Sequence, residues 1–200
     1  MGRLRQECPW DAQQTHRSLV QYLIEETAET IEAIELANQD HLREELGDLL
    51  LQVIFHAEIA SEQTRGFTVE EVARGIADKL ISRHPYVFAT AVVPVDLHYT
   101  WEQRKADEKG RTSALQGIPE QLSALARANK IIGKARSRRV ELALPDEPTT
   151  AEEVGAQILT LAARAQASGI DPEQALRDAV RVLEAQVRHA ESARDDATPA

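Results

Sequence analysis

The chain has 200 residues and a formal net charge of −10 at pH 7, and 42% of its residues are hydrophobic. This length fits one domain, or one domain with a small appendage, and the apolar share suffices for a packed core. A chain this acidic is a poor ligand for duplex nucleic acid, because phosphate contacts need a basic surface. We therefore predict no duplex nucleic acid as a partner, and because no segment reaches transmembrane length we predict no membrane partner either. The single cysteine, Cys8, excludes an internal disulfide and fits a reducing cytoplasm, the predicted location.

Helical periodicity runs through most of the chain and predicts an all-α fold, a helical bundle. The only β-like run, residues 87–93, is bracketed by prolines and is predicted to be an extended connection. Thr15, Asp40, Thr68 and Asp171 are predicted to cap helices or to stand in their first turns. The predicted helices cover residues 12–38, 40–63, 68–83, 97–109, 119–137, 150–167 and 171–192.

Two pairs of acidic residues interrupt the apolar stripes of the first two predicted helices. Glu26 and Glu29 are three apart, as are Glu45 and Asp48, so each pair shares one helix face. Clustered carboxylates that lose hydration repel one another and become neutral unless a cation holds them. Sets of carboxylate oxygens suit Mg²⁺ or Mn²⁺, so we predict a divalent-metal site between two helices. The alternative is a solvated acidic face, which is the usual place for glutamate.

Two further pairs have the spacing of neighbours on a helix face. Lys79 and Arg83 are four apart, and so are Trp101 and Lys105. Cations next to metal-bound anions are what a polyphosphate requires, and an indole can stack on a base. Taken singly, such residues are more often solvated cations or a packed tryptophan.

In their order along residues 3–137, these blocks resemble the MazG nucleoside triphosphate pyrophosphohydrolases. The four-acid pattern alone is moderately specific, and the blocks around it make the resemblance strong. The matching blocks are Cys8-Pro9-Trp10-Asp11-x-x-Gln14-Thr15, Glu25-Glu26-x-x-Glu29, Glu44-Glu45-Leu46-Gly47-Asp48-Leu49-Leu50, Arg83-His84-Pro85-x-Val87-Phe88 and Trp101-x-x-x-Lys105.

The resemblance implies an all-α bundle that forms dimers or higher homo-oligomers. It also implies cleavage of nucleoside triphosphates, ribo- or deoxyribo-, between the α and β phosphates to a monophosphate and pyrophosphate, a house-cleaning role in the nucleotide pool. The implied cofactor is Mg²⁺, with Mn²⁺ as a substitute, and its implied ligands are Glu26, Glu29, Glu45 and Asp48. The residues that would orient water or act as base are Glu25 and Glu44. The positions implied to contact the nucleotide are Lys79, Arg83, Trp101 and Lys105. No residue indicates a base or sugar preference.

An internal similarity suggests a second, incomplete copy of the first helices. Residues 44–50 resemble residues 152–158, but Ala156 stands where the earlier copy has Asp48. We therefore predict a catalytic module at 1–140, a linker at 141–149, a degenerate half-module at 150–192 that carries no chemistry, and a frayed tail at 193–200. The alternative is a chance likeness between amphipathic helix pairs.

Two other function classes compete with the hydrolase. A di-iron bundle needs Glu-x-x-His on two helices, and neither acidic pair has a histidine at that offset. The other class is a non-catalytic helical module for interaction or regulation that retains the fold. The basic run within residues 127–139 would then be a docking surface, although such runs are more often one solvated helix face.

Overall fold

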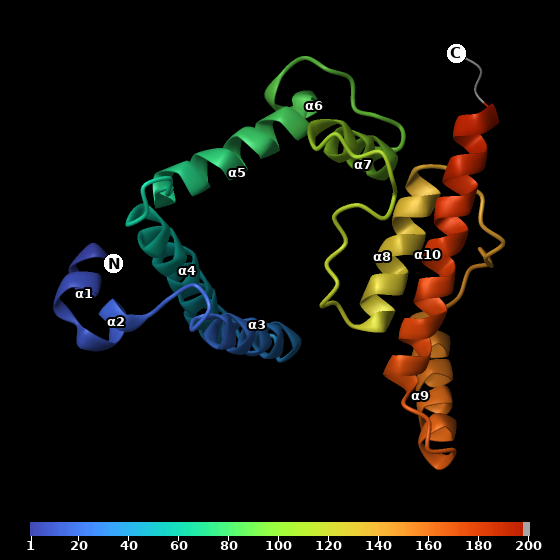
Figure 1. Ribbon diagram of the computed structural model, residues 1–200, viewed down its shortest axis with the longest axis horizontal. Helices are drawn as coiled ribbons and strands as arrows, with labels where there is room; N and C mark the ends of the chain where they lie inside the picture. Colours follow the sequence, from blue (N-terminus) through green and yellow to red (C-terminus); the bar gives the residue numbers. More distant parts are fainter. Residues whose placement is uncertain (198–200) are drawn as a thin grey trace. The chain divides into compact units, whose positions relative to one another are not determined.

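The computed structural model describes residues 1–197 and contains ten α-helices and no strand in that range (Figure 1), which confirms the all-α prediction. The chain divides into two compact units, Met1–Ala89 and Thr90–Ala200. The helices of the first unit are α1 Gly2–Glu7, α2 Pro9–Gln13, α3 Val20–Glu35, α4 Gln39–Ser61, α5 Val69–Arg83 and α6 Pro85–Phe88. Those of the second unit are α7 Leu97–Glu108, α8 Ala124–Ser137, α9 Ala151–Ala167 and α10 Pro172–Ala197.

The first unit is built on an antiparallel hairpin of α3 and α4. The connection is short: Ala37 adopts a left-handed conformation with φ of 52°, and the Asn38 side chain caps α4 by accepting a hydrogen bond from the backbone N–H of His41 at 3.1 Å. So tight a turn fixes the register of the two helices. The register in turn determines which acidic residues of α3 lie opposite those of α4.

The predicted helix at 12–38 is wrong in its first part, because α3 begins only at Val20. Residues 14–18 instead form a turn in which Ser18 Oγ accepts a bond from Thr15 N–H at 2.9 Å, and Thr15 Oγ1 accepts one from Ser18 N–H at 3.1 Å. Hydroxyl side chains that bond the backbone in this way compete with helix formation. The turn lets the α1–α2 segment fold back on α4, where the Arg5 guanidinium donates to both carboxylate oxygens of Glu62 at 2.7 Å.

The start of α5 follows from two local features. Thr68 caps the helix and forms a capping box with Glu71, which confirms the predicted cap. Gly66 lies just before it, where a Cβ atom would stand 1.8 Å from the carbonyl oxygen of Ala60. Only glycine therefore fits at this bend. At the end of α5, Pro85 begins the short helix α6, so the expected extended run starts with a helical turn.

The second unit has its core between α8 and α10. Ile131 on α8 is fully buried and belongs to one apolar cluster with Val180, Leu183 and Val187 of α10. This packing joins the segment before residue 140 to the one after residue 150, so the structure divides the chain at 89/90 and not at the predicted 140/141.

The predicted half-module, residues 150–192, differs between its two helices. Val180, Leu183 and Val187 of α10 are buried, whereas Val154, Ile158 and Leu161 of α9 are 41%, 42% and 61% exposed. The tail was predicted to fray from residue 193, but α10 continues through Ala197, and residues 198–200 lie outside the described part of the chain.

Two cations of the basic run within residues 127–139 are used inside the unit, whereas Lys130, Arg136 and Arg139 are exposed. The ammonium group of Lys134 is buried and donates to the carbonyl oxygen of Gln116 at 2.6 Å. The guanidinium of Arg127 donates to Glu184 of α10 at 2.6 and 2.9 Å. These cations hold neighbouring segments together, so their charges are satisfied within the unit. Within residues 1–197, no helix is long and apolar enough to cross a membrane.

Candidate metal centre

The hairpin brings three of the four predicted metal ligands together. One carboxylate oxygen from each of Glu26, Glu29 and Glu45 lies within 4.8 Å of the corresponding oxygens of the other two. Asp48 lies one turn after Glu45 on α4, and its charge acts on Glu26. The pairing follows from the helical spacing: in an antiparallel hairpin, the acid pair of α3 meets the acid pair of α4.

Glu45 is the most buried member of the cluster, at 6% exposure. Its Oε1 lies 2.8 Å from Nε2 of His41, one turn earlier on α4. Its Oε2 is buried and has no hydrogen-bond partner among the residues that the structure describes. Leaving a buried carboxylate oxygen in this state is costly, so the site favours a cation at that oxygen.

The carboxylates also raise one another's affinity for protons. Desolvation, followed by the charges of Asp48 and Glu29, raises the pKa of Glu26 above its usual range. Desolvation, followed by the charge of Glu45, raises the pKa of Glu29. Both shifts express the cost of crowding negative charge without a counter-ion. An all-oxygen donor set of this kind fits Mg²⁺ or Mn²⁺.

Glu25 and Glu44, the expected water-orienting residues, each precede one of the cluster residues and are exposed. The charge of Glu25 adds to the raised pKa values of both Glu26 and Glu29, so its carboxylate lies close to the cluster.

Lys79 and Arg83 lie in the second half of α5, where Arg83 is buried at 8% exposure and Lys79 is partly buried. The charges that act most strongly on Glu26 and Glu29 come from α3 and α4.

Trp101 and Lys105 belong to the second unit, on α7, and both are partly buried. The ammonium group of Lys105 lies 2.6 Å from the Glu102 carboxylate, three residues earlier. A phosphate that binds Lys105 would have to compete with this ion pair.

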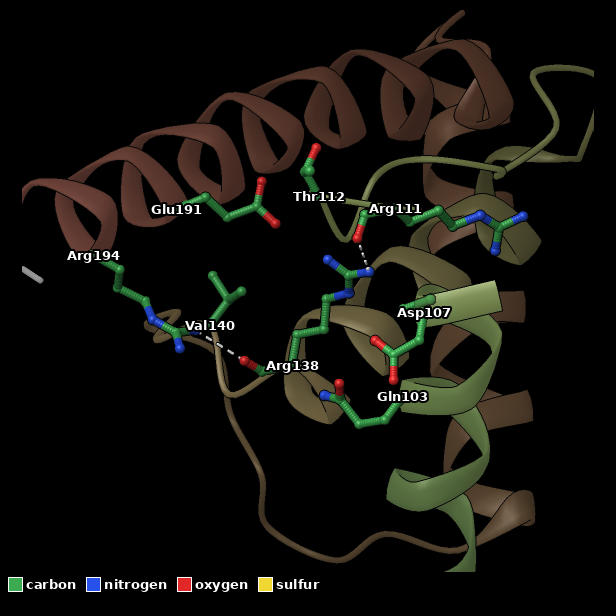
Figure 2. A pocket seen from close by; sticks show the side chains of 9 residues that line it. Gln103, Asp107, Arg111, Thr112, Arg138, Val140, Glu191 and Arg194 are labelled. Atoms are coloured by element: carbon green, nitrogen blue, oxygen red, sulfur yellow. Dashed lines mark hydrogen bonds between the residues drawn. The ribbon is translucent and has the colours of Figure 1, made fainter. Parts of the chain in front are cut away.

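The second unit contains a polar pocket of 280 Å³ that the sequence did not indicate, because its walls come from four separate segments (Figure 2). Arg138 donates to the carbonyl oxygen of Arg111 at 2.9 Å, and Arg194 to that of Arg138 at 2.9 Å. Glu191, on α10, accepts a bond from the backbone N–H of Ala114 at 2.7 Å. These bonds join the chain segments around the pocket.

Beside the acids, the first unit carries a group of aromatic rings. The Trp10 ring lies 5.8 Å from that of Tyr22 on α3 and 6.4 Å from that of Phe55 on α4, in both cases edge to face. Tyr22 is one turn from Glu26 along α3. Trp10 is 50% exposed, so the group is open to solvent on one side.

Two residues of the hairpin, His41 and Gln52, were not predicted from the sequence to belong to the site. His41 had a visible signal, since it is four residues before Glu45 and therefore on the same helix face. Gln52 is four residues after Asp48 and so lies on the helix face that carries the acids, but its exposure of 5% depends on contacts that the sequence does not give.

Comparison with known proteins agrees with this site. Residues 14–88, which include the acidic cluster, match the MazG nucleotide pyrophosphohydrolase domain. An uncharacterised 26.1 kDa protein of Streptomyces cacaoi is 44% identical over 195 residues, which cover 96% of this chain and 79% of that protein.

Two similar proteins carry functional names. The nucleoside triphosphate pyrophosphohydrolase/pyrophosphatase MazG of Thermotoga maritima is 40% identical over 203 residues, covering 90% of this chain and 78% of that protein. The nucleoside triphosphate pyrophosphohydrolase of Escherichia coli K12 is 45% identical over 139 residues, covering 66% of this chain and 52% of that protein. The resemblance seen in the motifs is thus confirmed, and the chain belongs to the MazG family of nucleotide pyrophosphohydrolases.

Proposed function

We propose that this chain hydrolyses nucleoside triphosphates between the α and β phosphates, releasing a nucleoside monophosphate and pyrophosphate, with Mg²⁺ as cofactor. The observation that carries the proposal is the convergence of Glu26, Glu29 and Glu45 within 4.8 Å around a buried carboxylate. Membership of the MazG family and the names of its relatives support the same activity. The reaction would serve to clear nucleotides from the cytoplasmic pool.

In this proposal Glu26, Glu29, Glu45 and Asp48 hold Mg²⁺, or Mn²⁺ in its place. The bound ion would neutralise phosphate oxygens and lower the pKa of water. Glu25 is the nearer candidate base, since its charge already acts on two of the ligands, and Glu44 is the second. Either carboxylate would take the proton as the water oxygen bonds to the α-phosphorus. The bond from that phosphorus to the bridging oxygen then breaks, and pyrophosphate leaves with its electron pair.

Four further residues are proposed to contact the substrate. Lys79, Arg83 and Lys105 would neutralise the departing pyrophosphate, and Trp101 would pack on the nucleoside. Their support is the family resemblance of their positions.

We also propose that the protein is a homo-oligomer, a dimer or larger, formed through the hairpin. The buried apolar cluster of the first unit contains only three residues among those described, Leu19, Phe55 and Ile59. By contrast, large apolar side chains are exposed along both hairpin helices, and such a surface is typical of a protein interface. A second copy of the chain presents the same two faces and so offers an apolar surface of matching extent. The exposed side chains include Ile24 at 66%, Ile31 at 51%, Ile34 at 58%, Leu50 at 56% and Val53 at 43%.

The central experiment is product analysis with a panel of ribo- and deoxyribonucleoside triphosphates and Mg²⁺. Pyrophosphate and monophosphate should be the products, and excess chelator should abolish turnover. In water enriched in ¹⁸O, the label should appear in the monophosphate, as attack at the α-phosphorus requires. Orthophosphate and diphosphate as main products, or turnover that survives the chelator, would refute the proposal.

A matched pair of variants ties this activity to the cluster. Glu45→Gln should lose most turnover, whereas Glu32→Gln, an exposed position on α3, should keep it. Light scattering at graded concentrations tests the oligomer, and a monomer at all concentrations would refute that part.

A further inference from the structure

Gln52 is a buried polar residue without an evident structural task. It lies on α4 and is 5% exposed, and its Oε1 has no hydrogen-bond partner within the described part of the chain. Turning the amide over would only exchange the unpaired oxygen for an unpaired NH₂ group. A buried amide in either state costs free energy of folding, so a partner from outside the unit would relieve a real penalty.

The position of Gln52 indicates what that partner is. A single stripe of α4, spaced by three and four residues, contains Glu45, Asp48, Gln52 and Phe55. Gln52 therefore lies between the carboxylate cluster and the aromatic group, one turn or about 6 Å from Asp48 along the helix axis. Across the hairpin, α3 follows the same order, with Glu26 among the acids and Tyr22 among the rings one turn away.

The groups of a nucleotide follow one another in the same order as these side chains, with the phosphates at one end and the base at the other. Its phosphates suit the metal cluster, and its base offers hydrogen-bonding edges and two flat faces. The Trp10 indole, half exposed beside Tyr22 and Phe55, gives a face on which a base can stack. Glutamine amides pair with base edges through one donor and one acceptor.

We propose that Gln52 is the residue that reads the nucleobase, with Trp10 as the stacking surface beside it. The amide oxygen accepts a hydrogen bond from an N–H group on the base edge, while the phosphates lie at Glu26, Glu29 and Glu45. This inference rests on the proposed function and adds to it a determinant of base specificity within the first unit.

The test compares Gln52→Met, which keeps the length of the side chain and removes the amide, with Gln21→Met, the same change at an exposed position on α3. For each protein, kcat/KM is measured on nucleoside triphosphates of all four bases. It is also measured on an analogue of the preferred substrate that lacks the base N–H group. Inorganic tripolyphosphate, which has no base, is used as a competitive inhibitor.

Wild type should prefer some bases and should discriminate against the analogue by about tenfold or more, the effect of one unpaired buried group. Gln52→Met should lose this discrimination and bind tripolyphosphate as wild type does, and Gln21→Met should behave as wild type throughout. The melting temperature of the Gln52→Met variant should hold or rise, because this substitution removes an unpaired polar group. Equal turnover of all bases by wild type, or a Gln52→Met variant that keeps the preference, would overturn the inference.

Two controls distinguish a failure of this inference from a failure of the proposed reaction and from a role of Gln52 in oligomer contacts. If wild type released no pyrophosphate, the same comparison would be made on equilibrium binding of the nucleotides with Mg²⁺ by calorimetry. Base selectivity in binding that Gln52→Met loses would then support the role of Gln52 even though the proposed reaction had failed. If Gln52 instead bonds a second copy of the chain, Gln52→Met would change the oligomeric state in light scattering and leave base preference intact, which would overturn the inference.

Discussion

His41 holds the buried carboxylate of Glu45 from one turn away on the same helix, with Nε2 2.8 Å from Oε1. This contact fixes the orientation of the most buried ligand while its other oxygen stays available to a cation. A hydrogen-bonded carboxylate is positioned before a metal arrives, which reduces the entropy lost on binding.

Replacing His41 by alanine should weaken metal binding without unfolding the protein. Loss of a residue that orients a ligand typically lowers metal affinity about 10- to 100-fold. Calorimetric titration with Mn²⁺ would measure the change, and Gln39→Ala, at an exposed position at the start of α4, is the control. Unchanged affinity would mean that the hydrogen bond does not position the ligand.

Glu26→Gln and Asp48→Asn should each lose most activity and keep the helical fold. Removing one crowded carboxylate relieves repulsion in the metal-free protein, so its melting temperature should hold or rise. The stabilisation on adding Mg²⁺ should shrink, because it depends on ligand affinity. Thermal melts with and without Mg²⁺ provide the measurement, with Glu32→Gln as control. Wild-type turnover in either variant would identify these residues as surface acids.

The first unit should lose stability as the pH falls through the range below 6.5. His16 Nδ1 and His56 Nδ1 lie 2.8 Å apart in nearly parallel rings, so one must donate while the other accepts. Burial, and then the charge of His16, lowers the pKa of His56 below 6.5. Between that lowered pKa and 6.5 the unfolded chain binds more protons, so stability is fully present above 6.5 and declines on acidification.

Denaturant titrations at pH 7.5 and pH 5 test this dependence in a pair of variants. His56→Gln should reduce the difference in unfolding free energy between the two pH values, whereas His189→Gln, at an exposed position on α10, should preserve it. An equal pH dependence in wild type and His56→Gln would exclude this contact as its source.

The second unit should depend on the contact between α8 and α10. Ile131 is fully buried against the α10 residues of the core, so Ile131→Ala should cost about 2–5 kcal/mol in unfolding free energy. Leu125→Ala, on the same helix at 50% exposure, should change it by about 0.5 kcal/mol or less. Urea denaturation distinguishes the two, and comparable losses would show that the core lies elsewhere.

The acids at the start of α9 should have a structural effect and no chemical one. Glu153 completes a capping box with Thr150, and those hydrogen bonds lower its pKa. The double variant Glu152→Ala with Glu153→Ala should loosen the first turn of α9, visible as faster amide hydrogen exchange there. The turnover rate should stay within about threefold of wild type. A large loss of turnover in the folded variant would place chemistry in this helix.

Local sequence patterns determined most of the helices and the candidate ligands. A period of 3.6 residues, a cap such as Thr68 and a three-residue spacing between acids act within one or two helical turns, so they can be interpreted without knowing the fold. The pairing of Glu26 and Glu29 with the acids of α4 also followed, because a short connection forces neighbouring helices to run antiparallel.

Only the tertiary structure decided which groups are buried, paired or left unpaired. The hydroxyls of Thr15 and Ser18 delay the start of the first predicted helix to Val20, and the apolar cluster that contains Ile131 and Val187 joins segments on both sides of the expected domain boundary. The burial of Glu45 and Gln52, and the lack of a hydrogen-bond partner for one oxygen of each among the described residues, likewise depend on which side chains of α3 pack against α4. Burial and hydrogen bonding are properties of contacts between distant segments, and periodicity within one segment does not specify those contacts.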